Sequence, residues 1–333
     1  MSSCPPKLLL TAALLSWRVL AQPSTPVIID TDAGSDDLMA IAFLLSHRDV
    51  RIEAITIANG LAHVGAGASN VVRLLDLAGH REIPVYIGSE RPLRGNAEFP
   101  AEWRRNADLL PGVQLPKGGR KPEPRPAADY LADRLRESGK PARILALGPL
   151  TNLAAALRRI GAAPGSVERI VIMGGAIDVP GNLGDGGAFK TANKTAEWNI
   201  FVDPLAADIV FRSGIPLCLV ALDATNEVKI DQTFLNEFRA SRLTRLGQFV
   251  SQVLATEEPM IHDGTFYAWD PLAGASLVDA AVLKTKPLRI EIRQSGNEMG
   301  RTVRLAAGAS NGDVALGANA EEFLKIFLKT FRN

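Results

Sequence analysis

The chain has 333 residues, of which 47% are hydrophobic and 22% are charged, with 29 Gly and 21 Pro. This composition is that of an ordinary globular enzyme and excludes a chain that is disordered over most of its length. A formal net charge of +1 excludes a broad positive field for nucleic acid or an anionic membrane, so we expect a small-molecule ligand and no nucleic-acid partner.

The amino terminus has the pattern of a secretory signal peptide. Lys7 precedes an apolar run from Leu8 to Trp17, and Val19-Leu20-Ala21 forms a small-residue cleavage site. The alternative is a cytosolic protein with an apolar amino-terminal helix. We predict a signal peptide over residues 1–21 and a mature domain over residues 22–333 that is periplasmic or secreted. No other segment approaches about 20 uninterrupted apolar residues, so we expect no membrane association after processing.

Cysteine usage indicates no disulfide framework. Cleavage after residue 21 would remove Cys4 and leave Cys218 as the remaining cysteine. Because Cys218 lies in the apolar run from Ile215 to Leu222, we predict a buried structural thiol rather than a catalytic one.

Apolar, β-rich runs alternate along most of the chain with segments whose apolar residues recur at helical spacing. Strands are predicted at Val27–Ile29, Ile52–Ile57, Pro84–Ile87, Ile144–Leu147, Ile170–Met173 and Pro216–Val220. Helices are predicted at Asp36–Ser46, Ala66–Ala78, Ala127–Glu137, Leu150–Arg158 and Pro204–Arg212. This alternation predicts a single α/β domain with a mostly parallel central β-sheet flanked by helices, Rossmann-like and open. The site is expected at the carboxyl ends of the strands.

The late part of the chain follows a different pattern. Helical spacing extends over Gln232–Glu257 and Phe266–Asp279, and a last helix is predicted at Ala320–Phe331. Between them, Leu288–Arg293 and Thr302–Leu305 have the pattern of a β-hairpin whose turn contains Gly.

Two stretches match no regular element. Residues Arg91–Arg125 are rich in Pro and charge, and residues Pro180–Thr195 are rich in Gly and Asn. Long loops in a compact domain are usually functional or mobile. Because both stretches follow predicted strands or their extensions, we expect them to border the site.

The strongest local signal is the acidic run Asp30-Thr31-Asp32-Ala33-Gly34-Ser35-Asp36-Asp37, which lies between a predicted strand and a predicted helix. The four carboxylates of this run repel one another at close range. Hard cations such as Ca²⁺ are bound by carboxylate and carbonyl oxygens, so the run predicts a metal site. Gly34 is expected to turn the backbone tightly and so bring Asp32 and Asp37 toward one point.

Other interpretations of the acidic run explain less of it. In a solvated acidic turn, the helix dipole would account for Asp36 and Asp37 but not for the other two carboxylates. An EF-hand is excluded, because the glycine falls too early and the terminal ligand position would be Ile41. A haloacid-dehalogenase-type phosphatase also begins with a strand and Asp-x-Asp, but it would have a hydroxyl residue in place of Gly34.

Four further motifs follow the acidic run: Leu147-Gly148-Pro149-Leu150-Thr151-Asn152, Ile172-Met173-Gly174-Gly175, Ala196-Glu197-Trp198-Asn199 with Asp203-Pro204, and Trp269-Asp270-Pro271-Leu272-Ala273. In this order, the five motifs resemble those of the nucleoside hydrolases, whose signature is Asp-Thr-Asp-x-Gly-x-Asp-Asp. Any one motif is weak, but the ordered set is specific and covers residues from about 27 to 280. The resemblance implies an α/β fold, hydrolysis of nucleoside N-glycosidic bonds and a homo-oligomer, either a dimer or a tetramer.

The resemblance also implies a calcium site and a catalytic base. Asp32, Asp37 and Asp270 would bind Ca²⁺ together with the backbone carbonyl of Leu147, and ribose hydroxyls and one water would complete the oxygen shell. Asp32 would act as the general base toward the calcium-bound water that attacks the anomeric carbon of the ribose.

The same resemblance assigns a set of substrate contacts. They are Asp36, Asn59, Met173, Asn182, Glu197 and Asn199, of which the polar ones would hold the ribose hydroxyls and stabilise oxocarbenium character. The match at Asn59 requires a shift of register. Without the resemblance, Glu197 and Asn199 would be interpreted as caps of the helix that begins near Pro204, and Asn182 as a turn residue.

Two tryptophans point to the kind of base. Many members of the family have a His immediately before the last metal-binding Asp, whereas this chain has Trp269, as in the purine-specific branch. Trp103 resembles the second tryptophan of that branch, so the purine would be stacked between Trp103 and Trp269, with Trp198 as a wall of the pocket. The alternatives are core packing for Trp269 and a loop anchor for Trp103. The pair His262-Asp263 is rejected for the metal, since the residues after it do not match.

The prediction is thus a purine nucleoside N-ribohydrolase that uses Ca²⁺. Three alternatives stay open: a hydrolase without purine or pyrimidine preference, a metal-dependent phosphatase, and an exported nucleoside- or ribose-binding protein without turnover. The phosphatase lacks a convincing downstream lysine motif. The binding protein would keep the same ligand contacts, but the presence of every carboxylate that the chemistry requires favours an enzyme.

Overall fold

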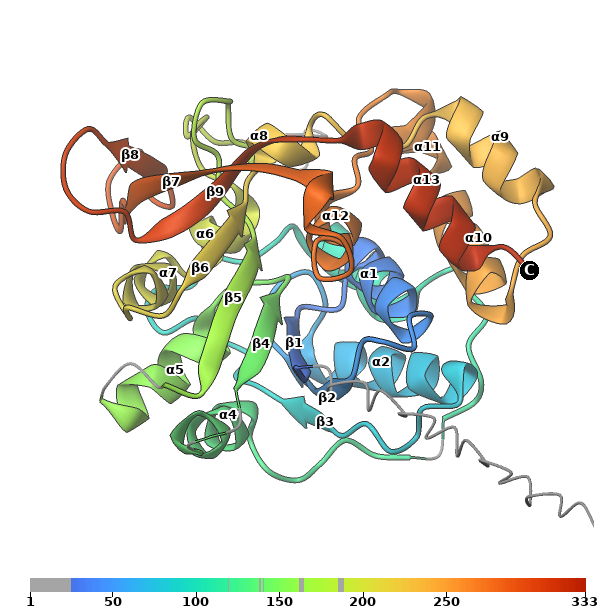
Figure 1. The fold of residues 1–333 in the computed structure, drawn as a ribbon, viewed down its shortest axis with the longest axis horizontal. Helices are drawn as coiled ribbons and strands as arrows, with labels where there is room; N and C mark the ends of the chain where they lie inside the picture. Colours follow the sequence, from blue (N-terminus) through green and yellow to red (C-terminus); the bar gives the residue numbers. More distant parts are fainter. Residues whose placement is uncertain (1–24, 119, 138, 140, 162–164, 185–188) are drawn as a thin grey trace, which may run out of the picture.

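The computed structural model describes residues 25–118, 120–137, 139, 141–161, 165–184 and 189–333. Within these ranges, nine strands form one sheet in the order β3-β2-β1-β4-β5-β6-β9-β7-β8 (Figure 1). The strands are β1 (Val27–Thr31), β2 (Ile52–Ile57), β3 (Val85–Ile87), β4 (Ala142–Ala146), β5 (Val167–Met173), β6 (Leu217–Val220), β7 (Leu283–Ile292), β8 (Thr302–Leu305) and β9 (Gly312–Ala318). The predicted signal peptide, residues 1–21, lies outside the described residues.

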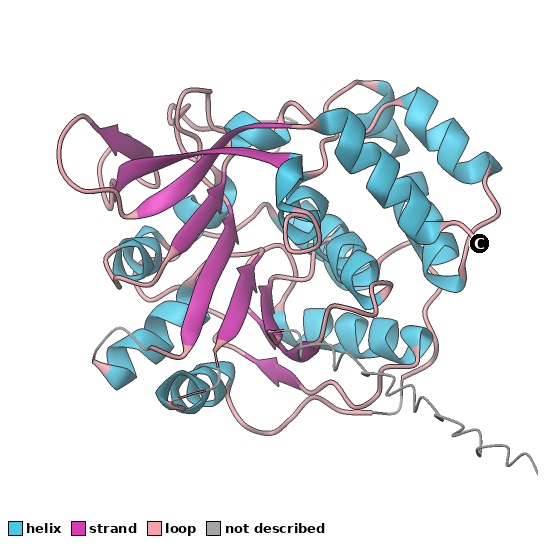
Figure 2. Ribbon diagram, in the orientation of Figure 1, coloured by secondary structure: helices cyan, strands magenta, loops and turns pink. Residues whose placement is uncertain are grey.

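The sheet is parallel from β3 through β9 in spatial order, and only β7 and β8 run antiparallel to their neighbours. The helices are α1 (Ser35–Leu45), α2 (Val64–Ala78), α3 (Ala101–Leu109), α4 (Ala127–Arg136), α5 (Thr151–Ile160), α6 (Trp198–Val202), α7 (Pro204–Phe211), α8 (Leu222–Thr225), α9 (Gln232–Ala240), α10 (Arg245–Thr256), α11 (Glu258–His262), α12 (Trp269–Ala275) and α13 (Ala320–Phe331). This arrangement confirms the predicted α/β domain with a mostly parallel sheet flanked by helices (Figure 2).

Two hydrophobic clusters lie on the two faces of the sheet. The strand β1 contributes to both, because successive side chains point to opposite faces: Ile29 belongs to the cluster under α1, α2, α10 and α13, and Ile28 to the cluster under α4, α5 and α7. Both side chains are fully buried, and burial of one such side chain is worth about 1.5–3 kcal/mol. The doubly covered sheet fixes the position of the loops at its carboxyl edge.

The predicted late elements differ from the observed ones in several places. The strand β7 begins at Leu283 and not at Leu288, and α11 was not expected. The helix expected over Gln232–Glu257 is two helices, α9 and α10, because Thr244 accepts a hydrogen bond from the backbone N of Gly247 at 3.0 Å and starts a new helix. The helix expected over Phe266–Asp279 begins only at Trp269. The strand β9 was not expected, since Gly312 and Gly317 interrupt its apolar pattern.

The long stretch Arg91–Arg125 is not loop throughout, because it contains α3. Cys218 is buried in β6, as predicted for a structural thiol. None of the helices in the described ranges combines the length and the apolarity that a membrane crossing requires.

Candidate active site

The acidic run occupies the junction between β1 and α1. Its backbone is fixed by Asp37, whose Oδ2 accepts a hydrogen bond from the backbone N of Gly34 at 3.0 Å, while its Oδ1 accepts one from the hydroxyl of Thr31. Thr31 Oγ1 in turn accepts a hydrogen bond from the backbone N of Ala33 at 3.0 Å. The carboxylate of Asp37 is thus oriented by its own loop before any ligand binds.

The expected role of Gly34 was wrong in one respect. The residue in the left-handed region is Ala33, with φ of 58°, whereas Gly34 has an extended backbone with φ of −66°. A Cβ atom on Gly34 would lie 2.6 Å from Leu61 Cδ2 and 3.0 Å from Asp37 Oδ2. A Cβ here would displace the end of the Leu61 side chain and press on the Asp37 carboxylate, so Gly34 permits close packing and does not supply a left-handed turn.

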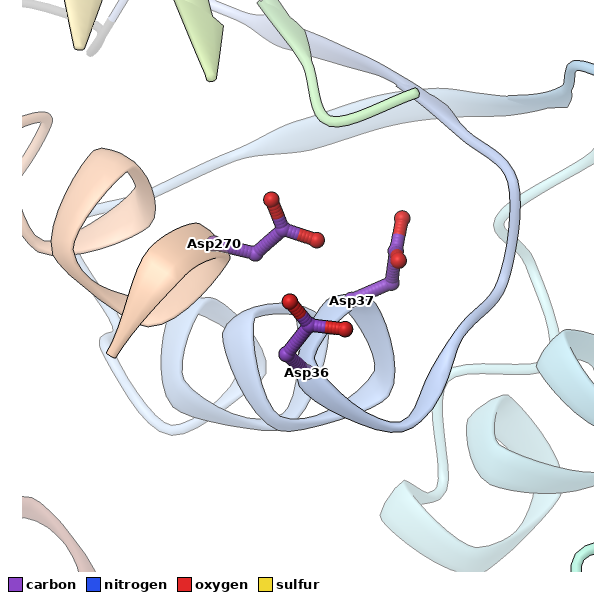
Figure 3. A group of neighbouring side chains, drawn as sticks. All are labelled: Asp36, Asp37 and Asp270. Atoms are coloured by element: carbon purple, nitrogen blue, oxygen red, sulfur yellow. The ribbon is translucent and has the colours of Figure 1, made fainter. Parts of the chain in front are cut away.

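Three carboxylates converge at this junction. Asp36 and Asp37 lie in the first turn of α1, and Asp270 lies in the first turn of α12 (Figure 3). One oxygen from each lies within 4.8 Å of the others. The two helices pack against each other at Gly274 of α12 and Ala40 of α1, where an added Cβ on Gly274 would make ordinary van der Waals contact with that of Ala40 at 3.5 Å.

Burial and mutual repulsion disfavour the charged forms of this cluster. Burial, followed by the charge of Asp36, raises the pKa of Asp37 to about 6, and burial with the charge of Asp32 raises the pKa of Asp36 to about 7. Burial and the charges of Asp37 and Asp36 raise the pKa of Asp270 well above its usual range. The donors are all carboxylate oxygens, from the buried Asp37 and Asp270 and the partly exposed Asp36. Such a set suits a hard divalent cation, which would supply the missing positive charge.

Asp32 occupies a narrow slot beside the cluster. Its Oδ2 accepts a hydrogen bond from the backbone N of Leu61 at 2.7 Å. A Cβ atom on Gly60 would lie 2.0 Å from that oxygen, and one on Gly148 would lie 2.8 Å from the Cβ of Asp32. Burial, and after it the charge of Asp37, raises the pKa of Asp32 well above its usual range. A side chain at Gly60 or Gly148 would overlap the Asp32 side chain in its present position, so both glycines make room for this carboxylate.

The polar residues after β4, β5 and the loop before α6 form a second group. The amide of Asn199 donates to the carbonyls of Leu147 at 2.8 Å and of Met173 at 3.2 Å. Glu197 caps α6 by accepting from the backbone N of Asn199 at 2.9 Å, and it also accepts from Gly175 N at 2.9 Å. The structure therefore brings the carbonyl assigned to the metal and three of the assigned substrate contacts together.

Without the family resemblance, Glu197 was interpreted as a cap of the helix that begins near Pro204. Glu197 is indeed a helix cap, but of a different helix. Glu197 caps the short helix α6, whereas α7, which begins at Pro204, is capped by Asp203. Burial raises the pKa of Glu197 although three backbone N–H groups point at its carboxylate.

The two remaining amides that the resemblance assigns to the substrate are those of Asn182 and Asn59. Asn182 Oδ1 accepts a hydrogen bond from the backbone N of Trp198 at 3.2 Å. Asn59 follows β2 and is 4% exposed, and in the described part of the chain its Oδ1 has no hydrogen-bond partner. A buried amide oxygen without a partner is costly, so this one is available for a ligand hydroxyl.

The three assigned tryptophans fall into two clusters. Trp198 is buried, stacks on Phe99 with ring centroids 4.8 Å apart, and meets the edge of Trp103 from α3 at 5.8 Å. Trp269 instead packs on the main core, with its ring edge-on to Phe266 at 5.5 Å. Trp103 and Trp269 are both partly exposed, as a ring that receives a flat base must be.

Sequence reasoning missed several residues of the site. Asp30 lies in the recognised motif but received no role; its Oδ1 accepts from Thr56 Oγ1 at 2.6 Å and from Asn152 Nδ2 at 2.9 Å. Glu257, between α10 and α11, lies close enough to Asp36 for its charge to raise the pKa of that carboxyl. No local pattern marks Glu257, because only the packing of α10 brings it there. His262 and Asp263 are exposed, in line with their rejection as metal ligands.

Comparisons with known proteins show the family to which the chain belongs. A family model described as inosine-uridine preferring nucleoside hydrolase matches residues 27–325. The pyrimidine-specific ribonucleoside hydrolase RihA of Shewanella sp. (strain MR-4) is 36% identical over 217 residues, which are 65% of this chain and 65% of that protein. The match thus spans slightly less than two thirds of the length of this relative.

Solved structures extend the likeness to nearly the whole chain. A plant nucleoside hydrolase, the PpNRh1 enzyme, has a TM-score of 0.82 at 30% identity and covers 92% of this chain and 99% of its own. A purine-preferring ribonucleoside hydrolase from Gardnerella vaginalis has a TM-score of 0.76 at 29% identity, with 92% and 97% covered. With its fold, its ordered motifs and its family match over residues 27–325, the chain belongs to the inosine-uridine preferring nucleoside hydrolases.

Proposed function

We propose that this protein is a divalent-cation-dependent N-ribohydrolase that cleaves ribonucleosides, with purines as the preferred bases. One observation carries the proposal: Asp36, Asp37 and Asp270 place three oxygens within 4.8 Å of one another, next to the buried carboxylate of Asp32. A stable fold tolerates such a group of buried like charges when a cation or a set of protons compensates them.

The cation would be held by Asp32, Asp37, Asp270 and the carbonyl of Leu147, and we propose Ca²⁺. The buried, all-oxygen character of these donors supports a hard cation. When bound, the cation would neutralise the carboxylates, orient the ribose diol and make a water easier to deprotonate. The carboxylate of Asp36 lies within the same group and would bind a ribose hydroxyl.

Asp32 would be the general base. During hydrolysis, the bond between the anomeric carbon and the base nitrogen breaks, a water oxygen bonds to that carbon, and a proton of the water passes to Asp32. The slot between Gly60 and Gly148 supports this role, since it holds one rigid orientation of the carboxylate. The departing nitrogen takes a proton from the solvent and leaves as a neutral base, and Asp32 then releases its proton to the solvent, which restores the starting state.

The second group would bind the sugar. Asn182, Glu197 and Asn199 carry carboxylate and amide oxygens that can accept hydrogen bonds from ribose hydroxyls and stabilise positive charge that develops on the ring. The unpartnered Oδ1 of Asn59 offers a further acceptor. The shared contacts of Asn199 with Leu147 and Met173 support a link between the sugar contacts and the metal side.

The base preference is the finer part of the proposal, since the relatives differ in theirs. RihA is described as pyrimidine-specific, and the Gardnerella vaginalis protein as purine-preferring. In this chain, a partly exposed tryptophan, Trp269, directly precedes Asp270, and Trp103 contacts the tryptophan between Glu197 and Asn199. One large aromatic ring thus lies next to the metal ligand Asp270, and the other contacts the segment of the proposed sugar contacts Glu197 and Asn199. Such a pair favours a large flat base.

The test is an assay of free base and free ribose from inosine, adenosine, guanosine, uridine and cytidine, with and without a chelator. We expect release from the three purine nucleosides that stops on chelation and returns when Ca²⁺ is added. Release from all five at equal rates would disprove the purine preference and leave the hydrolase. Binding of nucleosides without release of base would favour a binding protein instead.

We also propose that the protein acts after export. The charged residue, apolar run and small-residue site of residues 1–21 support this. Mass spectrometry of the protein from the cell envelope and medium should find a mature chain that begins at Gln22. A full-length chain in the cytosol would contradict export.

A further inference from the structure

The hairpin of β7 and β8 contacts the segments that carry Asn182 and Glu197, two of the proposed sugar contacts, through four consecutive residues. These residues, Met299–Thr302, form the end of the turn between β7 and β8 and the first residue of β8, and we call them the brace. In Figure 1 the hairpin lies at the end of the sheet remote from α1 and α2. No sequence motif of the site includes the brace.

Thr302 holds the loop after β5. Its hydroxyl accepts a hydrogen bond from Ala176 N at 2.9 Å and donates one to Ala176 O at 2.7 Å, and the side chain is 1% exposed. The neighbouring Gly175 has φ of 76°, and a Cβ there would be 2.9 Å from Thr302 Cγ2. Since Gly175 N donates to Glu197 at 2.9 Å, Thr302 fixes one of the groups that orient the Glu197 carboxylate.

The other three residues of the brace hold the segment before α6. Met299 O accepts a hydrogen bond from Asn193 Nδ2 at 2.8 Å, and Arg301 forms a β-bridge with Ala196. Gly300, with φ of 86°, lies so close to α6 that a Cβ would be 2.6 Å from the Cα of Phe201. Ala196 O in turn accepts from Asn182 N at 3.2 Å. Through Asn193 and Ala196, the brace thus supports the backbone that positions Asn182 and Glu197.

Within the described ranges, no hydrogen bond of Met299–Thr302 reaches Asp32, Asp36, Asp37 or Asp270. We infer that Thr302 is a positioning residue for sugar recognition, which aligns the Glu197 side of the site and leaves cation binding independent of it. This inference rests on the proposed function, because it assigns the sugar contacts to that group.

The test compares Thr302→Val with Thr302→Ser. Valine keeps the shape of threonine but loses both hydrogen bonds to Ala176, whereas serine keeps the hydroxyl. For each variant we would measure kcat and KM for inosine, the inhibition constant of free ribose, the calcium affinity by titration calorimetry and the midpoint of thermal unfolding. Thr285→Val is the matched control, since it places the same substitution at an exposed position of β7 in the same hairpin.

We expect Thr302→Val to weaken ribose inhibition about tenfold, which corresponds to about 1.4 kcal/mol, and to leave the calcium affinity within about twofold of the wild type. Thr302→Ser should restore ribose affinity, and Thr285→Val should not change it. An unchanged inhibition constant in Thr302→Val would overturn the inference. So would a parallel loss of calcium and ribose affinity, because the residue would then support the whole fold.

If Thr302→Val does not fold, a second variant tests the same inference. Asn193→Asp removes the donor to Met299 O and keeps the acceptor Oδ1 that bonds to Ala196 N at 3.2 Å. It should also weaken ribose inhibition without a change in calcium affinity, and unchanged ribose inhibition would count against the brace. A wild-type protein that binds calcium but releases no base from any nucleoside would instead disprove the proposed function.

Discussion

The two sides of the site are built in different ways. The metal side comes from the loop between β1 and α1 with the first turn of α1, from Asp270 and, as proposed, from the carbonyl of Leu147, and hydrogen bonds within that loop orient Asp37. The sugar and aromatic side combines α3, the loop after β5, α6 and the brace, which are far apart in the sequence. Changes on the first side should therefore abolish chemistry, and changes on the second should alter which substrate is bound.

The largest effect is expected from Asp32→Asn. Asparagine has nearly the same shape and cannot take the proton, so kcat for inosine should fall by about 10³-fold, in the range for loss of a general base. Steady-state kinetics measures this. Asp49→Asn, an exposed position after α1, should retain the wild-type rate. A kcat within tenfold of the wild type in the Asp32 variant would remove the residue from the chemistry.

Gly148→Ala tests whether the slot around Asp32 matters in itself. The added methyl group would lie 2.8 Å from the Cβ of Asp32, so the carboxylate must move. A displacement of this size should lower kcat by roughly 100-fold. Gly65→Ala is the control, because its Cβ meets no atom within 4 Å and alanine favours the helix α2. Equal activity of both variants would contradict a rigid base.

On the aromatic side, Trp103→Ala should affect purines more than pyrimidines. Loss of stacking on one ring should lower kcat/KM for inosine by about tenfold more than for uridine, since stacking on an aromatic side chain is worth about 1–3 kcal/mol per base. Trp269→Phe keeps an aromatic ring and should cause a smaller purine-selective loss. Equal losses for inosine and uridine would argue against base stacking.

The smallest effect is on stability, and it should depend on pH and cation. Asp30, Asp36 and Asp37 have pKa values raised to about 6, 7 and 6, so the folded state binds more protons than the unfolded state between about pH 4 and pH 7. The free energy of unfolding of the chelated protein should therefore fall as the pH rises through that window. Scanning calorimetry should show a midpoint lower by about 5 °C at pH 8 than at pH 5.

Added Ca²⁺ should reverse this trend, because it stabilises the charged carboxylates of the folded state. A midpoint of thermal unfolding that rises with pH in the presence of the chelator would contradict this prediction. It would show that groups other than protons or the cation balance the negative charges of the cluster. Asp36→Asn should reduce the dependence on pH in the chelated protein, since it removes one of the groups whose pKa is raised.

The acidic cluster was predictable in part, because Asp32, Asp36 and Asp37 lie in one short run between a strand and a helix. Asp270 was placed with them through the family resemblance, and the structure brings it beside Asp36 and Asp37. The fold class was predictable because most strands and helices from β1 to α7 have their own pattern, with α3 and α6 as the exceptions. What failed locally was the role of Gly34, because the need for a missing Cβ is visible only once Leu61 is in place.

The rest of the site could not be predicted in this way. Glu257 and Thr302 have no motif, and each reaches the site only through tertiary packing of α10 or of the hairpin. The helix α3 was missed because its sequence is charged and short, and of its two buried residues, Arg104 and Ala107, only the second is apolar. Long-range contacts of this kind leave no periodic trace in the sequence.

The position of β9 has a consequence for how the chain acquires its structure. This strand belongs to the last part of the sequence, yet it lies between β6 and β7 and supplies hydrogen bonds to both. During synthesis, which begins at the amino terminus, the edge of β6 therefore stays unpaired until almost the whole chain has been made. Completion of the sheet is a late event, and a chain truncated before Gly312 should aggregate through that edge rather than form a smaller enzyme.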